Sequence, residues 1–278
     1  MQDVVRSKFA PSTIQSASAL LQLQPGSVVF CDFDGPIVDV SDRYYHTYCL
    51  ALKATQAEYV KHAALPVRRL TKTQFWYMKQ NRVPDFTIAD WSGLSGQQVK
   101  DFLGHVQALV NQPALLHRDR LQPGVKAALN QLQACGIRIV LVTLRQAGQV
   151  LDFLHQHDLA TTISQIYGAD DAETAYANCI EHKVARLTEA IAEQRQLGFN
   201  TTASCMIGDT EADVRAGQAA QLPTIALTCG IRSALYLNDF APTAVYADLQ
   251  AALQDLIHHP ASLEAAVWHH EPAADVRC

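Results

Sequence analysis

Four aspartates follow two apolar segments that are far apart in the sequence. Asp32 and Asp34 come directly after one segment, and Asp209 and Asp213 follow the other. An apolar run that ends in a turn signal is typical of a buried strand, and ligands bind at the carboxyl ends of the strands in open α/β sheets. Close carboxylates repel each other unless a cation or a proton lies between them, and Mg²⁺ prefers oxygen ligands. The sequence therefore indicates a magnesium site; the alternative is that these acids only cap helices.

Two further polar residues stand where they could act on a phosphate group. Thr143 follows another apolar run, and the backbone amides after it could hold a phosphate. Lys183 opens a predicted helix before the second pair of aspartates and could neutralise negative charge. Taken by itself, Thr143 is more simply explained as a helix cap and Lys183 as a surface lysine.

Apolar runs and helical patterns alternate along most of the chain. The runs predict strands at residues 28–31, 137–142, 163–167, 203–207, 223–227 and 244–246. Helical patterns lie between them at residues 124–135, 147–157, 181–196, 211–220 and 249–257. This alternation predicts an α/β fold, in which a doubly wound, Rossmann-like parallel sheet is covered by helices on both faces.

Residues 41–120 interrupt the alternation. They have helical patterns at 44–59, 71–80 and 97–110 and no convincing strand, so we expect an all-helical insertion. The predicted organisation is an N-terminal extension (1–25), a catalytic core (26–40 and 121–258), a helical cap (41–120) and a C-terminal tail (259–278).

The inserted segment is more basic than the rest of the chain. Its stretch from 65 to 84 holds five basic residues and no acidic one: Arg68, Arg69, Lys72, Lys79 and Arg82. One hypothesis is a basic lid that draws an anionic substrate towards the acidic core; the alternative is a solvated helix face. Candidates for substrate contact in this segment are Tyr44, Tyr45, Arg68, Arg69, Phe75, Trp76 and Trp91.

The composition limits the classes of protein to which this chain can belong. Of the 278 residues 49% are hydrophobic, which is enough to bury a core. With 22 basic and 27 acidic residues the net charge is −5, whereas general nucleic-acid binding needs a basic surface. The apolar runs are far shorter than the ~20 residues that span a bilayer.

The seven cysteines are scattered and contain no CxxC pair, so neither a disulfide framework nor a zinc site is indicated. The first 25 residues lack the continuous apolar stretch of a signal peptide. We expect a cytoplasmic protein without nucleic-acid or membrane partners.

Taken in order, the polar motifs resemble a known family. The segment DFDG at 32–35, Thr143, Lys183 and the segment GDTEAD at 208–213 are similar to the four motifs of the haloacid dehalogenase-like hydrolase superfamily. The resemblance covers roughly residues 25–36 and 121–258. By its position and helicity, the insertion resembles the helical caps of that superfamily, as in its phosphoglycolate phosphatase-like branch.

This resemblance implies Mg²⁺-dependent hydrolysis of a small phosphate monoester. Asp32 would attack phosphorus and form an aspartyl phosphate, and Asp34 would protonate the leaving alcohol and then activate water. The metal would be held by Asp32, the backbone carbonyl of Asp34, and Asp209. Asp213 would anchor Lys183 or a metal-bound water.

The resemblance also implies a set of phosphate contacts. Thr143 and Lys183 would hold the phosphate and neutralise its charge. Leu144 stands where the family usually has a small polar residue, so its backbone and the side chain of Arg145 would take over that contact. Pro36 replaces a commoner threonine, which a turn tolerates.

Two other functions remain possible for such a chain. A phosphomutase of the β-phosphoglucomutase type would use the same core residues but exclude water. A regulatory or binding protein could keep the fold without catalysis, although the intact acids argue against it. The acid at position 34 favours phosphate esters, because the dehalogenase branch usually lacks it. The expected partner is a small phosphorylated substrate, and the chain is expected to be a monomer or a homodimer.

Overall fold

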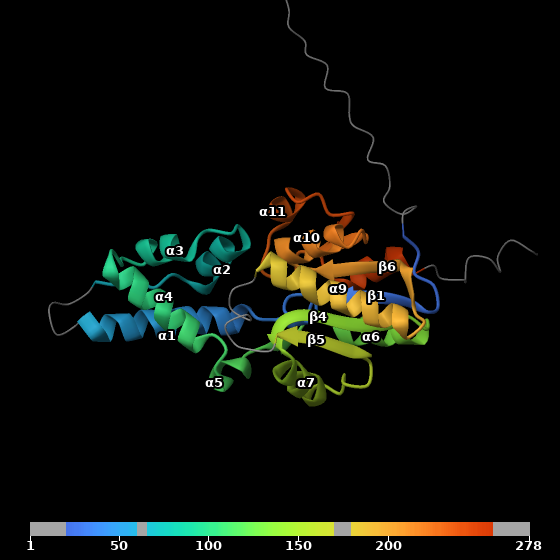
Figure 1. The fold of residues 1–278 in the computed structure, drawn as a ribbon. Helices are drawn as coiled ribbons and strands as arrows, with labels where there is room; N and C mark the ends of the chain where they lie inside the picture. Colours follow the sequence, from blue (N-terminus) through green and yellow to red (C-terminus); the bar gives the residue numbers. More distant parts are fainter. Residues whose placement is uncertain (1–20, 60–65, 170–178, 258–278) are drawn as a thin grey trace, which may run out of the picture.

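A parallel six-stranded sheet forms the centre of the protein (Figure 1). The computed structural model describes residues 21–59, 66–169 and 179–257. The strands lie in the order β5 (Gln165–Ala169), β4 (Arg138–Gln146), β1 (Ser27–Cys31), β6 (Asn200–Gly208), β7 (Thr224–Leu227) and β8 (Ala244–Tyr246). All neighbouring pairs are parallel. The predicted α/β fold class is confirmed.

The central strand shows why this apolar pattern forms a doubly covered sheet. Successive side chains of a strand point to opposite faces. Val29 and Cys31 of β1 pack into one apolar cluster, and Val28 and Phe30 pack into another. The first cluster is completed by α6 (Val125–Ala134), α7 (Ala147–Gln156) and α12 (Leu249–Leu256), and the second by α9 (Ile180–Gln196) and α10 (Glu211–Ala219).

The strand order places the chemically important segments beside one another. β1 is flanked by β4 on one side and β6 on the other, so the connections leave the sheet in opposite directions there. Ligands of open α/β sheets bind at such a switch point, outside the carboxyl ends of the strands. Asp32 follows β1 and Asp209 follows β6, while Thr143 lies in β4.

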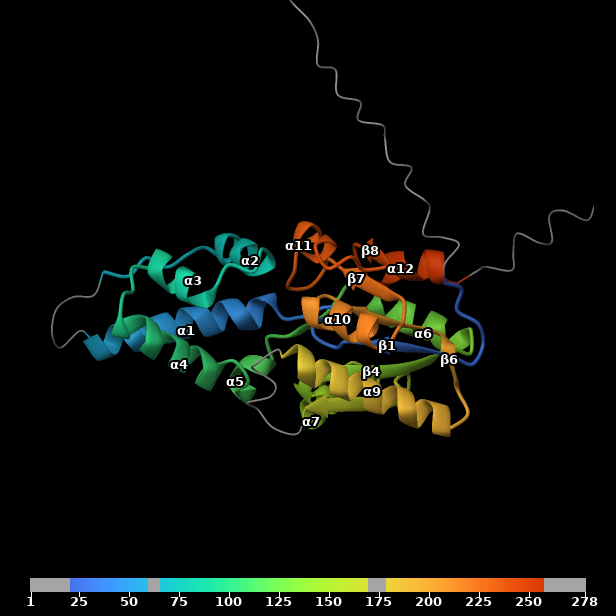
Figure 2. The ribbon, with the colours of Figure 1, turned by 45° about the horizontal axis from the view of Figure 1, so that its top comes forward.

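A second group of helices lies beyond this edge of the sheet (Figures 1 and 2). It comprises α1 (Ser41–Tyr59), α2 (Lys72–Gln80), α3 (Asp85–Trp91), α4 (Gln97–Leu109) and α5 (Pro113–Leu116). These helices share an apolar cluster of their own, in which Tyr48 stacks on Phe75 with ring centroids 5.0 Å apart. Phe102 meets the edge of Tyr48 at 6.1 Å. We call this group the cap.

The structure differs from the sequence expectations in its short elements. Residues 41–120 were expected to hold no strand, but β3 (Arg120–Leu121) pairs antiparallel with β2 (Val38–Asp39) where the chain leaves and re-enters the core. β4 continues to Gln146 instead of ending at Thr143. The helices α3, α5 and α11 (Ala234–Asn238) were not expected. Two strand residues, or one or two helical turns, are too short to show a hydrophobic period.

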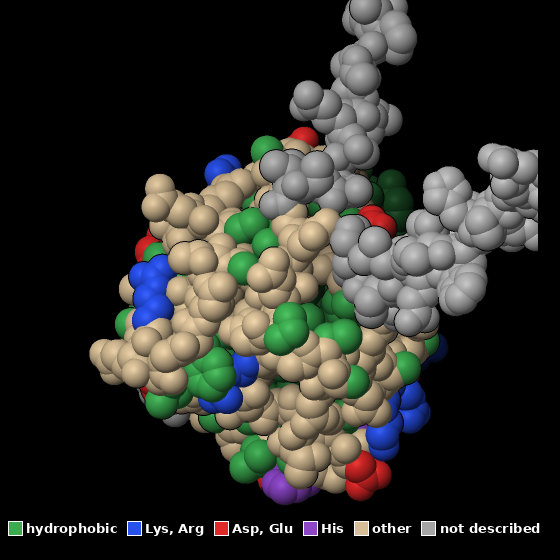
Figure 3. Space-filling view, turned by 90° about the vertical axis from the view of Figure 1, so that its right-hand side faces the viewer, with side chains coloured by type: hydrophobic (Ala, Val, Ile, Leu, Met, Phe, Trp, Pro, Cys, Tyr) green, Lys and Arg blue, Asp and Glu red, His purple; other side chains and the backbone are tan. Residues whose placement is uncertain are grey.

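Figure 3 shows the face of the molecule that lies opposite the cap. On the face in Figure 3, the basic and acidic side chains that are visible among the described residues are scattered. Within the described part of the chain, none of the helices is long and apolar enough to cross a membrane.

Candidate active site

Asp32 and Lys183 form the floor of the site. Asp32 is 7% exposed, and Lys183, from the first turn of α9, is 2% exposed. The Lys183 ammonium lies 2.9 Å from Oδ1 of Asp32 and 2.8 Å from Oδ1 of Asp213. Burial alone would lower the pKa of Lys183, but Asp213 and Asp32 raise it above its usual value, so the ammonium stays charged.

Three carboxylates converge on this floor. Ligand atoms of Asp32, Asp209 and Asp213 all lie within 4.8 Å of one another. Burial raises the pKa of Asp32, the charge of Lys183 lowers it and the charge of Asp213 raises it, and together they bring it to about 7. Burial, followed by the charges of Asp213 and Asp32, raises the pKa of Asp209 well above its usual value. With all three carboxylates ionised, the cluster would hold more negative charge than the Lys183 ammonium can balance.

The residues present fit a divalent cation. Oδ2 of Asp209 accepts a hydrogen bond of 2.6 Å from the backbone of Ile231. Its Oδ1 is buried and has no partner among the described residues, and a buried unpaired carboxylate oxygen is costly. An oxygen-only set of this kind suits Mg²⁺.

Two glycines let the chain approach these carboxylates closely. Gly35 has φ +94°, and a Cβ built on it would overlap the carboxylate of Asp209. A Cβ on Gly208 would likewise overlap the carboxylate of Asp213. The glycines of both sequence motifs are therefore required by the packing of the site.

Asp213 has two structural tasks. Its Oδ2 accepts hydrogen bonds from the backbone N–H and the hydroxyl of Thr210, at 3.0 and 2.7 Å, where α10 begins. Its Oδ1 faces Lys183. Helix capping was the alternative to a metal site, and the family resemblance implied that Asp213 anchors Lys183; this side chain makes both the capping contact and the contact with Lys183.

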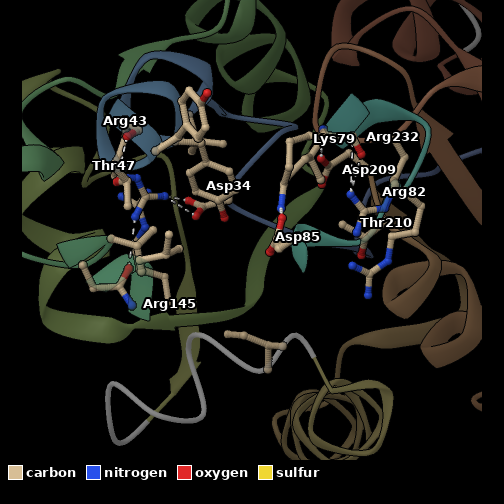
Figure 4. Close-up of a pocket in the computed structure, with 18 of the residues that line it drawn as sticks. Asp34, Arg43, Thr47, Lys79, Arg82, Asp85, Arg145, Asp209, Thr210 and Arg232 are labelled. Carbon is tan, nitrogen blue, oxygen red and sulfur yellow. Dashed lines mark hydrogen bonds and ion pairs between the residues drawn. The ribbon is translucent and has the colours of Figure 1, made fainter. Parts of the chain in front are cut away.

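Asp34 points into a separate buried network. Its Oδ2 lies 2.8 Å from Nη2 of Arg43, and its Oδ1 lies 2.8 Å from Nη2 of Arg145 (Figure 4). Both arginines also pair with the buried Asp119, at 3.0 and 2.6 Å. Burial would raise the pKa of Asp34, but Arg145 and Arg43 lower it below its usual value. The network joins the first turn of α1 to the end of β4.

The four residues predicted to contact the phosphate share a place in the cavity wall but differ in their other contacts. Thr143 is 1% exposed, and Thr143, Leu144, Arg145 and Lys183 all line the cavity above the floor. The guanidinium of Arg145 is directed at Asp34 and Asp119. Phosphate contact by these four residues stays a prediction.

The cavity has a volume of about 320 Å³ and is bounded by both the sheet edge and the cap. On one side of Figure 4 Asp34 lies between Arg43 and Arg145, and on the other side the end of α2 meets the core. There Glu211 lies 2.9 Å from Arg82 of the cap and 2.8 Å from Arg232 of the core.

Among the cap candidates, Tyr44, Phe75, Lys79 and Arg82 line the cavity. Arg68 and Arg69 are exposed and are not among the residues that line the cavity, so substrate contact by this pair stays a prediction without support from the cavity wall. Trp91 is 60% exposed, and Tyr45 donates its hydroxyl to the backbone oxygen of Leu70.

Sequence reasoning missed five charged residues of the site. They are Arg43, Asp85, Asp119, Glu211 and Arg232. For two of them the sequence signal was proximity to a motif: Glu211 lies inside the second acidic segment, and Arg43 lies nine residues after Asp34. Their pairing depends on how the cap meets the core, which no local pattern encodes.

Comparison with known proteins identifies the family. Residues 28–227 match the model of the haloacid dehalogenase-like hydrolases. The match spans more than half of the chain, so the protein belongs to this family, and the resemblance found in the motifs is confirmed.

Its curated relatives include phosphoglycolate phosphatases. The enzyme of Yersinia pseudotuberculosis is 26% identical over 230 residues, which are 80% of this chain and 90% of that enzyme. The enzyme of Psychrobacter arcticus is 28% identical over 138 residues, which are 49% of this chain and 55% of that enzyme. The match to the Escherichia coli enzyme likewise spans about half of that enzyme. These relatives agree with the prediction of a hydrolase of this family.

Solved structures of the family share the fold. A haloacid dehalogenase-like hydrolase from Streptococcus pneumoniae superposes with a TM-score of 0.59 at 17% identity, covering 82% of this chain and 96% of that one. A predicted phosphoglycolate phosphatase from Haemophilus somnus gives 0.59 at 18% identity, covering 84% and 98%. At these identities the likeness concerns the fold alone.

Proposed function

We propose that the protein is a Mg²⁺-dependent phosphatase that hydrolyses a small phosphate monoester through a phosphorylated Asp32. One observation carries this proposal. The buried carboxylate of Asp32 lies 2.9 Å from the Lys183 ammonium and within 4.8 Å of Asp209 and Asp213. An anionic nucleophile meeting a phosphate dianion needs compensating positive charge at short range.

Each residue has a defined task in this reaction. An Asp32 oxygen attacks phosphorus, the phosphorus–oxygen bond to the alcohol breaks, and water later attacks the same phosphorus to release phosphate and restore Asp32. Lys183 and Thr143 hold the phosphate oxygens. Asp213 and the helix-capping Thr210 keep Lys183 in place through the contacts described above.

Asp34 transfers protons to the leaving alcohol and from the attacking water. In its ionised form it accepts a proton from the attacking water, and in its protonated form it donates one to the leaving alcohol. Arg43 and Arg145 stabilise the ionised form. The two arginines therefore support the water-activating role of Asp34 most strongly.

The metal would be held by Asp32, Asp209 and the backbone carbonyl of Asp34, with Asp213 contributing indirectly. When bound, Mg²⁺ supplies positive charge that stabilises the phosphate during transfer. The unpartnered Oδ1 of Asp209 is the observation that supports a ligand there. We propose the same boundaries as above for the core and the helical cap.

A phosphatase screen with and without Mg²⁺ tests the function. The panel contains 2-phosphoglycolate, on which the named relatives act, together with sugar phosphates, nucleotides, pyrophosphate and aryl phosphates. Phosphate release that requires Mg²⁺ and disappears in Asp32→Asn is the expected result. Isomerisation of a sugar phosphate without phosphate release would instead identify a mutase. Full activity in excess chelator, or in Asp32→Asn, would contradict the proposal.

A further inference from the structure

The cavity above Asp32 continues into the apolar interior of the cap. Its wall includes buried side chains from four cap helices: Tyr48 of α1, Phe75 of α2, Ile88 of α3 and Phe102 of α4. These residues also belong to the apolar cluster that holds the cap together. The polar hydroxyl of Tyr48 is turned to Ser92 and the backbone of Leu70, at 2.9 Å each, so it is already satisfied.

The basic side chains in the wall are already paired. Besides the Arg43–Asp34–Arg145–Asp119 network, Lys79 lies 2.7 Å from Asp85. Arg82 and Arg232 share Glu211. Lys183 is held between Asp32 and Asp213 on the floor, where the phosphate is expected. A second anionic group on the substrate would find no cation in the described part of the wall that lacks a carboxylate partner.

The size of the cavity favours a substrate with an apolar group over a phosphate that carries only a two-carbon acid. About 320 Å³ falls in the range of ~300–1,000 Å³ in which pockets enclose whole small-molecule ligands. A phosphate with a two-carbon acid would occupy the floor and leave the apolar part unfilled. An aryl or branched alkyl group on the same phosphate would instead place apolar surface against the cap side chains that line the same cavity.

We infer that the substrate is a phosphate monoester whose leaving alcohol is uncharged and carries an apolar body of about the size of a benzyl group. This inference rests on the proposed function for the position of the phosphate. The side chains that recognise the apolar body are those of Phe75, Ile88, Phe102, Val106 and Val110. Removing apolar surface from water favours binding by roughly fourfold for each buried methylene.

The direct test uses phosphonates, which cannot be hydrolysed. Binding of methylphosphonate, benzylphosphonate and phosphonoacetate is measured by isothermal titration calorimetry with the full chain in Mg²⁺. We expect benzylphosphonate to bind at least ~10-fold more tightly than methylphosphonate. Equal affinity for these two, or tightest binding of phosphonoacetate, which carries an additional carboxylate, would overturn the inference.

A pair of variants on one helix supplies the structural control. Val106→Phe fills the cavity from α4, and Val99→Phe places the same side chain on α4 at a half-buried position outside the cavity wall. Val106→Phe should abolish the preference for benzylphosphonate, while Val99→Phe should keep it. An unchanged preference in Val106→Phe would argue against the apolar pocket. Thermal melts check folding, and if either variant is unfolded the wild-type comparison decides.

Turnover separates this inference from the proposed function. The kcat/KM values of benzyl phosphate, ethyl phosphate and 2-phosphoglycolate are compared, because all three have alkyl leaving groups. The expected order places benzyl phosphate first. Selective binding of benzylphosphonate without turnover of any ester would refute the phosphatase and leave the ligand class standing. Turnover of an ester together with equal affinity for methylphosphonate and benzylphosphonate would refute the ligand class and leave the phosphatase standing.

Discussion

Replacement of Lys183 by Met is expected to lower the stability of the folded protein, because it removes the positive charge that two buried carboxylates share. The ammonium is 2% exposed and lies within 3 Å of both Asp32 and Asp213. Without it, two buried carboxylates lose their common partner. Breaking a buried ion pair by removing one member costs roughly 3–5 kcal/mol, because the other charge stays buried and uncompensated.

This cost converts into a measurable shift of the melting temperature. A domain of about this size loses roughly 2–4 °C for each kcal/mol, so Lys183→Met should lower Tm by roughly 6–20 °C in the presence of chelator. The loss should depend on pH. The folded-state pKa of Asp32 is already raised to about 7, and Lys183 acts to lower it, so its removal raises this pKa further. A raised carboxyl pKa costs nothing in acid and costs progressively more as the pH rises through it.

The assay is a thermal melt at pH 5 and at pH 8 in excess chelator. Lys126→Met is the control, since Lys126 is 51% exposed and lies 3.6 Å from the exposed Asp158. Exposed pairs of this kind contribute about 0–1 kcal/mol. The melting temperature of Lys183→Met should fall further below that of the wild type at pH 8 than at pH 5. If both variants melt with the wild type, or if the Lys183→Met deficit is the same at the two pH values, the described charge balance is wrong.

Three shorter predictions concern activity and metal binding. Asp34→Asn should slow alkyl phosphates by ~10²-fold or more and aryl phosphates less, because aryl leaving groups need little protonation; equal slowing in steady-state assays would refute the proton-donor role. Mg²⁺ affinity, measured by calorimetry, should rise between pH 6 and pH 8 as Asp32 loses the proton that competes with the metal. Asp209→Asn should weaken Mg²⁺ binding. A Mg²⁺ affinity that does not change with pH would contradict the competition between the proton and the metal. Arg82→Gln should reduce the salt dependence of kcat/KM, whereas Arg68→Gln should not, because only Arg82 lines the cavity; the same salt slope in both would exclude steering by Arg82.

The core of the fold could be predicted because its signals are local. Each buried strand of the sheet is an apolar run, and each covering helix has an apolar face, so their order in the sequence indicates the sheet. The acidic residues at the ends of β1 and β6 meet because adjacent parallel strands end at the same edge. Lys183 alone resembled a surface lysine, and only the combination of motifs placed it beside Asp32.

The arrangement of the cap could not be predicted in the same way. Arg43 and Asp119 are separated by the whole insertion, and they meet because the chain returns beside its point of departure through β2 and β3. The contact of Arg82 with Glu211 depends on which face of α2 turns to the core. Such contacts join distant segments without any sequence period, so the substrate-facing wall becomes visible only in the folded chain.

The central claim is that Asp32 carries the phosphoryl group during turnover. The direct measurement is to quench the reaction with the best substrate of the screen in its first turnover and to treat the protein with borohydride. Borohydride reduces an acyl phosphate to an alcohol but leaves a free carboxylate unchanged. Peptide mass spectrometry should then find homoserine at position 32, in wild type and not in Asp32→Asn. Turnover with an unmodified Asp32 in every quenched sample, or the adduct at Asp34 or Asp209 instead, would contradict the account.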